Sequence, residues 1–174
     1  MLSTKRKSGT GGAGPITSIV EAIVQQLRQQ MWLPSIYEHK IRHLRTRAYS
    51  LDIHPPVKSV EIQHTLLGIE LKADKRRIAC PDLATARYLA VFARIGCTEI
   101  AVPYDITRIS VLADELESAW QKMILLVEHN TTDKTIQARS RVKSRLVKAI
   151  RQSINEIGSG NKVPTFNQNH RCPK

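Results

Sequence analysis

A row of basic residues near the C-terminal end of the sequence carries its strongest chemical signal. Lys134, Arg141, Arg145 and Lys148 follow one another at spacings of seven, four and three residues, with Arg151 beside them. Residues at these spacings lie on one face of a helix. Cations on one helical face can bind the phosphates of a nucleic acid, an acidic protein surface or an anionic membrane. The sequence therefore predicts an anion-binding helix between residues 133 and 157.

The opposite side of the same segment is apolar. Its stripe consists of Val142, Leu146, Ile150, Ile154 and Ile157. A membrane-surface helix is disfavoured, because this stripe has no Trp or Phe to anchor it at the lipid interface. The alternative to nucleic-acid binding is a protein-interaction adaptor, in which the basic helix docks on an acidic partner or self-associates through the stripe. A basic face that is merely solvated is the remaining interpretation.

The excess of positive charge lies in the two ends of the sequence. The chain of 174 residues has a formal net charge of +12, yet residues 52 to 128 carry nine Lys and Arg against eleven Asp and Glu. A field of one sign that is concentrated on a few elements attracts polyanions. We therefore expect Arg42 and Arg45, in the basic N-terminal part, to contact phosphates together with the C-terminal row. The partner can be DNA, RNA or an acidic protein surface.

Two aspartates stand at similar places in the central region. Asp82 and Asp105 each follow a predicted strand and a proline. At the carboxyl edge of a parallel sheet, two such carboxylates could hold a divalent metal. The simpler prediction is that each aspartate caps the N-terminus of the helix that follows it.

A nuclease centre is the remote alternative. Glu70-Leu71-Lys72, with Glu61 or Asp52 upstream, resembles the Glu-x-Lys step of restriction-endonuclease-like nucleases, in which acids bind Mg²⁺ and the lysine orients water or stabilises charge. The match covers three residues, and the Pro81-Asp82 pair follows it instead of preceding it. An exposed hairpin, whose charges discourage edge-to-edge pairing, explains the same pattern.

The sequence favours a non-catalytic protein with no cofactor and no metal site. His39 and His43 are four residues apart, but no glutamate completes a His-Glu-x-x-His motif. The three cysteines lack C-x-x-C spacing, and neither a phosphate-binding glycine loop nor a G-x-S-x-G motif occurs. The function expected is therefore a nucleic-acid-associated or regulatory protein.

Helices are expected in five segments, where apolar residues recur every three or four positions. They are residues 17 to 33, 35 to 49, 82 to 95, 105 to 129 and 133 to 157. The pair Pro55-Pro56 ends the helical N-terminal part.

Extended structure is expected between these helices. Residues 57 to 72 alternate in polarity with a change of phase near 65 to 68, which indicates a bulge or bend. A turn at 73 to 76 leads into a strand at 77 to 80 that completes a hairpin, and another strand spans 99 to 102. The repeated strand-Pro-Asp-helix order favours parallel strands joined by a right-handed crossover.

The prediction is an α/β or α+β protein. It comprises two N-terminal helices, a β-hairpin, one or two strand-helix units forming a small mixed sheet, and a C-terminal basic amphipathic helix. Its parts are a disordered basic tail (1 to 15), a core domain (16 to 130), the basic helix (131 to 158) and a second disordered tail (159 to 174). Because no apolar run approaches the ~20 residues of a membrane span, we expect a cytoplasmic protein.

Overall fold

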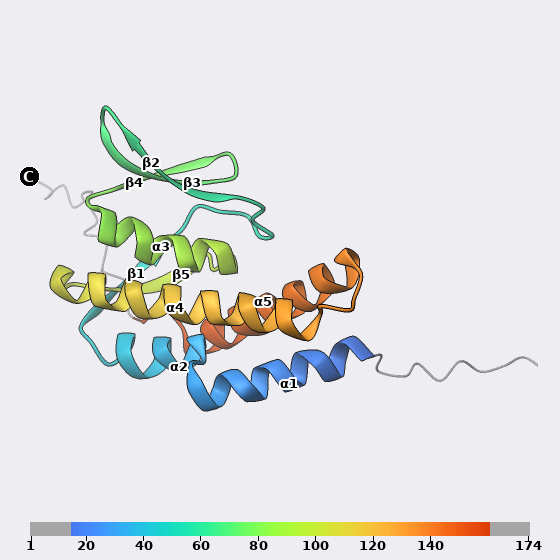
Figure 1. Cartoon of the computed structure of the whole chain (residues 1–174). Helices are drawn as coiled ribbons and strands as arrows, with labels where there is room; N and C mark the ends of the chain where they lie inside the picture. Colours follow the sequence, from blue (N-terminus) through green and yellow to red (C-terminus); the bar gives the residue numbers. More distant parts are fainter. Residues whose placement is uncertain (1–14, 161–174) are drawn as a thin grey trace, which may run out of the picture.

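The computed structural model describes residues 15 to 160 and has an α+β architecture (Figure 1). The expected combination of helices and strands is confirmed, whereas most of both predicted tails lies outside the described residues. In chain order the elements are α1 (Pro15–Gln30), α2 (Leu33–Ile36), η1 (Tyr37–Ile41), β1 (Thr46–Ser50), β2 (Val60–Thr65), β3 (Gly68–Ala73), β4 (Arg76–Cys80), α3 (Leu83–Ile95), β5 (Glu99–Pro103), α4 (Ile106–Asn130) and α5 (Ile136–Ile157).

The strands form two small antiparallel sheets and not one mixed sheet. One contains β2, β3 and β4 in sequence order, and the other contains β1 and β5. The expected parallel crossover is therefore wrong. The tight turn after Ala73 pairs β4 with β3, while β5 pairs antiparallel with β1, so the two strands of the repeated motif belong to different sheets.

The second predicted helix is wrong in its C-terminal half. Helical structure ends with the π-turn η1, and residues 46 to 50 form β1. Tyr37 and Ile41 are fully buried as the helical stripe requires. Beyond them, pairing with β5 outweighs the local helical pattern, because β-branched and aromatic residues such as Thr46 and Tyr49 suit a strand.

Near residue 65, where the polar alternation changes phase, the chain reverses its direction. Thr65 pairs with Gly68, so Leu66 and Leu67 form the loop of a hairpin in place of a bulge. The Thr65 hydroxyl accepts a hydrogen bond from the Leu67 amide and donates one to the Gly68 carbonyl. Gly68 has φ +124°, a conformation that L-residues rarely adopt.

Helix α5 packs on the rest of the protein with the side chains of its apolar stripe. Val142, Leu146, Ile150 and Ile154 are at most 1% exposed, and α5 contacts α1, α4 and α3. Its first turn is capped by Thr135, whose hydroxyl accepts a hydrogen bond from the Ala138 amide at 3.2 Å. These four side chains of the stripe are therefore covered by the chain's own core and offer no surface for self-association.

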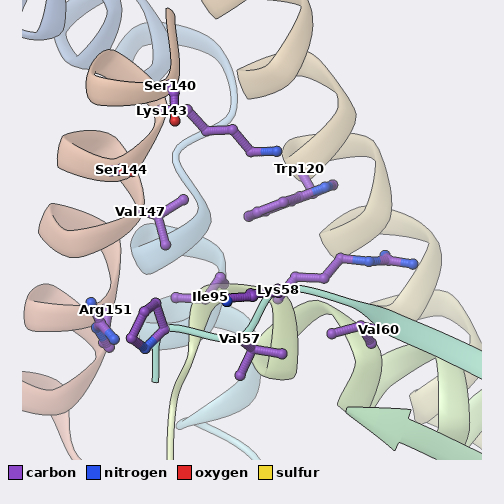
Figure 2. A pocket seen from close by; sticks show the side chains of 12 residues that line it. Val57, Lys58, Val60, Ile95, Trp120, Ser140, Lys143, Ser144, Val147 and Arg151 are labelled. Atoms are coloured by element: carbon purple, nitrogen blue, oxygen red, sulfur yellow. The ribbon is translucent and has the colours of Figure 1, made fainter. Parts of the chain in front are cut away.

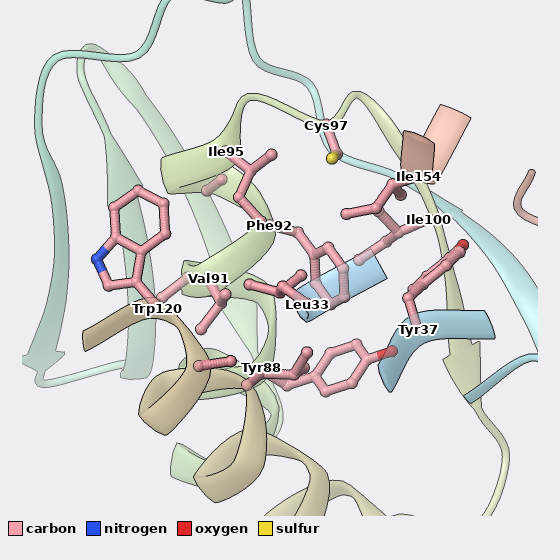
Figure 3. Close-up of a cluster of buried hydrophobic side chains, with 14 of the residues drawn as sticks. Leu33, Tyr37, Tyr88, Val91, Phe92, Ile95, Cys97, Ile100, Trp120 and Ile154 are labelled. Carbon is pink, nitrogen blue, oxygen red and sulfur yellow. The ribbon is translucent and has the colours of Figure 1, made fainter. Parts of the chain in front are cut away.

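The interior also contains two tyrosines that complete the hydrogen bonding of β5. The Tyr37 hydroxyl accepts a hydrogen bond from the Ala101 amide (2.9 Å), and the Tyr88 hydroxyl donates to the Ala101 carbonyl (2.7 Å). Both rings pack on Phe92 (Figure 3), with centroid distances of 5.6 and 5.1 Å. These hydroxyls take the place of a third strand beside β5.

Between residues 15 and 160, each helix is either too short or too polar to cross a bilayer.

Candidate anion-binding site

A cavity of about 570 Å³ opens along one side of α5 (Figure 2). Its walls come from α5, from Trp120 on α4, from the last turn of α3, and from the segment 56 to 60 that leads into β2. Figure 2 shows Lys143 extending from α5 toward Trp120, with Arg151 farther along the same helix. The cavity thus brings together four stretches of chain that are far apart in the sequence.

The charges that line the cavity are all positive. They belong to Lys58, Arg94, Lys143 and Arg151, and no Asp or Glu from residues 15 to 160 lines the cavity. Within this same part of the chain, no carboxylate oxygen lies within 4.0 Å of these four side-chain cations. Cations without a neutralising partner inside a recess produce a strong positive potential. The cavity is therefore suited to an anion.

The remaining lining combines hydroxyl groups with an apolar wall. Ser140 and Ser144 are one turn apart on α5 and supply hydroxyls that can donate to a bound oxyanion. Trp120 lies with its ring centroid 5.9 Å from the Lys143 ammonium, a cation–π distance. The aliphatic part of the wall is made by Val57, Val60, Ile95 and Val147.

Asp74 holds the segment that carries Lys58. This aspartate occupies the turn between β3 and β4 with φ 52°. One of its carboxylate oxygens accepts hydrogen bonds from the Ser59 amide (2.9 Å) and the Lys58 amide (3.1 Å). Both hydrogen bonds lower the pKa of the Asp74 carboxyl below its usual value, and the bond from the Ser59 amide has the larger effect. Residues 58 and 59 are thereby fixed to the β3–β4 turn.

Gly96 leaves room for the guanidinium of Arg151. It ends α3 in the left-handed conformation, with φ +84°. A Cβ atom at this position would lie 3.0 Å from Nη1 of Arg151 and 2.9 Å from Cβ of Pro55. A side chain at position 96 would therefore disturb both the cavity and the turn that enters it.

The predicted basic row divides between the outer face of α5 and the cavity. Arg141, Arg145 and Lys148 are exposed, and Lys134 is exposed in the turn before the helix. Arg145 donates a hydrogen bond to the Thr17 hydroxyl at 2.9 Å. Only Arg151 of the predicted set lines the cavity.

Arg42 and Arg45 lie away from the cavity lining. The Arg42 guanidinium donates to the Thr46 hydroxyl at 3.3 Å and lies close to Gly160, just beyond the end of α5. The Arg45 guanidinium lies 5.3 Å from the centre of the Tyr104 ring. These two arginines therefore flank the β1–β5 sheet and do not line the cavity.

Sequence reasoning missed three of the four cavity cations. Lys143 carries a usable signal, since residues 143, 147 and 151 recur every four positions and share one flank of α5. Lys58 and Arg94 carry no such signal, because only the tertiary fold brings their segments to the helix.

The two central aspartates are helix caps, as predicted. The Asp82 carboxylate accepts from the Thr85 amide at 2.7 Å, and the Asp105 carboxylate accepts from the Thr107 amide at 3.0 Å. They follow strands of different sheets.

The glutamates of the nuclease alternative lie on the outer face of the three-stranded sheet. Glu61 is opposite Lys72, and both are on the face away from Leu71, which is buried. Glu70 forms an ion pair with Arg77 at 3.5 Å. The rings of His39 and His43 are stacked with centroids 6.4 Å apart. Residues 15 to 160 contain no group of three side chains placed to hold a metal ion.

Comparison with known proteins adds no further constraint on the site. No family model, curated protein or solved structure matches the chain. The geometry and charge of α5 and its cavity are therefore the features that bear on what this protein binds.

Proposed function

We propose that the protein binds nucleic acid by contacting its phosphate backbone with α5, and that it does so without catalysis. The observation that carries this proposal is the lack of internal neutralisation on this helix. Six Lys and Arg side chains lie on α5 and Lys134 precedes it, yet within residues 15 to 160 none has a carboxylate oxygen within 4.0 Å. Their charge is available to an external polyanion.

Five cations elsewhere in the protein are neutralised, although others within residues 15 to 160, Lys58 and Arg94 among them, have no carboxylate oxygen within 4.0 Å. Ion pairs to aspartate or glutamate neutralise the cations of Lys40, Arg76, Arg77, Arg87 and Arg108. The Arg87 guanidinium contacts the carboxylates of both Asp114 (2.6 Å) and Glu117 (2.5 Å), and these ion pairs join α3 to α4. Within residues 15 to 160, α5 differs in holding six unpaired cations on one helix, and this concentration of positive charge supports a binding role.

The dimensions of α5 fit a phosphate backbone. With a rise of 1.5 Å per residue, the outer cations from Arg141 to Lys148 extend over about 11 Å. A duplex carries one charge per ~1.7 Å of its axis, so this length faces several phosphates. No aromatic residue lies on α5. Binding that is largely independent of base sequence is therefore expected from the outer face.

A salt series tests the proposal directly. If about five cations contact phosphates, log K falls with log salt with a slope of roughly −4.5 on a duplex, which is a loss of several hundredfold between 50 and 200 mM. Fluorescence anisotropy with a labelled duplex and with a structured RNA measures this slope. A flat response, or a dissociation constant weaker than about 10 µM at 50 mM salt, would contradict the proposal.

Charge-reversal variants locate the contact. The triple variant R141E/R145E/K148E should remove most of the affinity and flatten the slope, because three contacts become repulsive. A matched control is K75E/R76E/R77E, which changes the net charge equally but at the β3–β4 turn, where Arg76 and Arg77 already have acidic partners. Equal losses in both variants would mean that net charge, and not α5, determines binding.

A further inference from the structure

We propose that the cavity beside α5 binds a nucleoside phosphate, at a site separate from the phosphate contacts on the outer face of the helix. The outer face is convex and exposed, whereas the cavity is a recess walled by four chain segments. Its volume of about 570 Å³ lies within the ~300–1,000 Å³ range of small-ligand pockets. A recess of this kind can accept one nucleotide but not a continuous duplex.

The phosphate end of the ligand is matched by the cations. Lys143 and Arg151 are eight residues apart on α5, which separates them by about 12 Å along the axis. Lys58 and Arg94 contribute from the other walls, and the hydroxyls of Ser140 and Ser144 lie along the same helix. A phosphomonoester with up to two negative charges and three terminal oxygens can pair with a cation at one end of the cavity and accept from a neighbouring hydroxyl, while the other cations contribute through their charge. The absence of any lining acid within residues 15 to 160 excludes a cationic ligand on electrostatic grounds.

The organic end of the ligand is matched by the apolar wall. Trp120 contributes the aromatic part of this wall, and Val57, Val60 and Val147 contribute aliphatic surface. Trp120 is buried, so the exposed part of this wall comes from the partly buried Val57, Val60 and Val147. Inorganic phosphate would leave this part in contact with water, whereas a base and sugar would cover it. A phosphate ester with a planar, apolar group therefore fits better than a bare oxyanion. Both a free nucleotide and the phosphorylated end of a strand present this chemistry.

The fluorescence of Trp120 reports binding directly. The chain contains two tryptophans, so the variant W32F leaves Trp120 as the single emitter. AMP should change this emission saturably and bind at least tenfold more tightly than adenosine or inorganic phosphate. Calorimetry on the parent chain should give the same order of affinities. Absence of saturable AMP binding would overturn the proposal, and equal affinities for phosphate and AMP would overturn the nucleoside assignment.

Substitutions in the cavity distinguish this site from the outer face. K143M and R151M should each weaken AMP about tenfold or more, since a hydrogen bond between charged groups is lost. S144E, at an exposed position where folding is not at risk, should do the same by repulsion. The matched control is R141M, an outward cation of the same helix, which should leave AMP binding unchanged. Unaltered AMP affinity in both K143M and S144E would overturn the proposal.

Competition separates the two sources of the ligand and keeps this proposal distinct from the nucleic-acid proposal. A 5′-phosphorylated single strand that displaces AMP, when its 5′-hydroxyl counterpart does not, identifies a strand end as the ligand. AMP that neither strand displaces identifies a free nucleotide. Salt-dependent duplex binding without AMP binding would overturn only the cavity site. AMP binding without duplex binding would overturn only the role of the outer face.

Discussion

The backbone amide and the backbone carbonyl of Ala101 are each hydrogen-bonded to a tyrosine hydroxyl. Its amide donates to the Tyr37 hydroxyl and its carbonyl accepts from the Tyr88 hydroxyl, in a region closed to water. The Tyr37 hydroxyl also donates to the Gly158 carbonyl at 2.9 Å, just beyond α5. Buried peptide groups that lose their partner incur the full cost of desolvation. Two hydroxyls thus connect β5 to η1, α3 and the end of α5.

Removing these hydroxyls should destabilise the protein without creating a cavity. We expect Y88F to cost about 1–3 kcal/mol of unfolding free energy, because the Ala101 carbonyl loses its partner. We expect Y37F to cost at least as much, since two hydrogen bonds are lost. Urea denaturation measures both values. Y49F is the control: no hydrogen bond of its hydroxyl occurs within residues 15 to 160, so a change under about 0.5 kcal/mol is expected.

At the scale of elements, α5 combines two unrelated roles on opposite sides. One side contributes four fully buried aliphatic side chains to the core, and the other exposes cations that have no acidic partner within residues 15 to 160. Because the sides are separate, stability and binding should respond to different substitutions on this one helix.

Two alanine substitutions on neighbouring turns should demonstrate this separation. L146A removes a fully buried side chain and should cost about 2–5 kcal/mol of unfolding free energy. R141A removes an exposed side chain and should change stability by less than about 0.5 kcal/mol while weakening duplex binding. Thermal or urea denaturation and anisotropy supply the two measurements. Stability losses of similar size would contradict the packing described for α5.

The features that could be predicted from the sequence are those specified by residues close together in the chain. The caps of α3 and α4, the left-handed end of α3 at Gly96 and the stripe of α5 were all predictable from a few neighbouring residues. Strand β1 was not, because its partner β5 lies about fifty residues further along the chain. The same difference applies to the cavity cations. Arg151 belongs to the basic row that the helical spacing of α5 predicts, whereas Lys58 and Arg94 reach the cavity only through the tertiary fold.

At the scale of the whole molecule, buried thiol and phenol groups make the unfolding free energy depend on pH in the alkaline range. Burial raises the pKa of the Cys97 thiol to about 12 from 9.0, although the nearby charge of Arg151 acts in the opposite direction. Burial also raises the pKa of Tyr37 and Tyr88 above 10.0. In each case the folded state holds the neutral form.

Stability should therefore fall as the pH rises above about 9. Below the unfolded pKa, the Cys97 thiol is protonated in both states and its contribution is complete. Above that pH the unfolded chain releases the proton while the folded chain keeps it, so Cys97 alone accounts for a loss of about 2 kcal/mol by pH 10.5. Urea unfolding between pH 8 and 10.5 measures the decline. The variant C97A should show a shallower decline, and an unchanged slope would contradict this assignment.

The pairing of α1 with α5 has a consequence for the newly made chain. Ile23 and Leu27 of α1 are buried, and α1 packs on α5 and α4. More than a hundred residues separate the end of α1 from the start of α5. At ~5–20 residues per second, a ribosome needs about 5–20 s to synthesise that interval. Throughout this time the apolar face of α1 has no α5 to cover it. The nascent chain therefore presents an exposed apolar surface that chaperones can bind before the basic helix is synthesised.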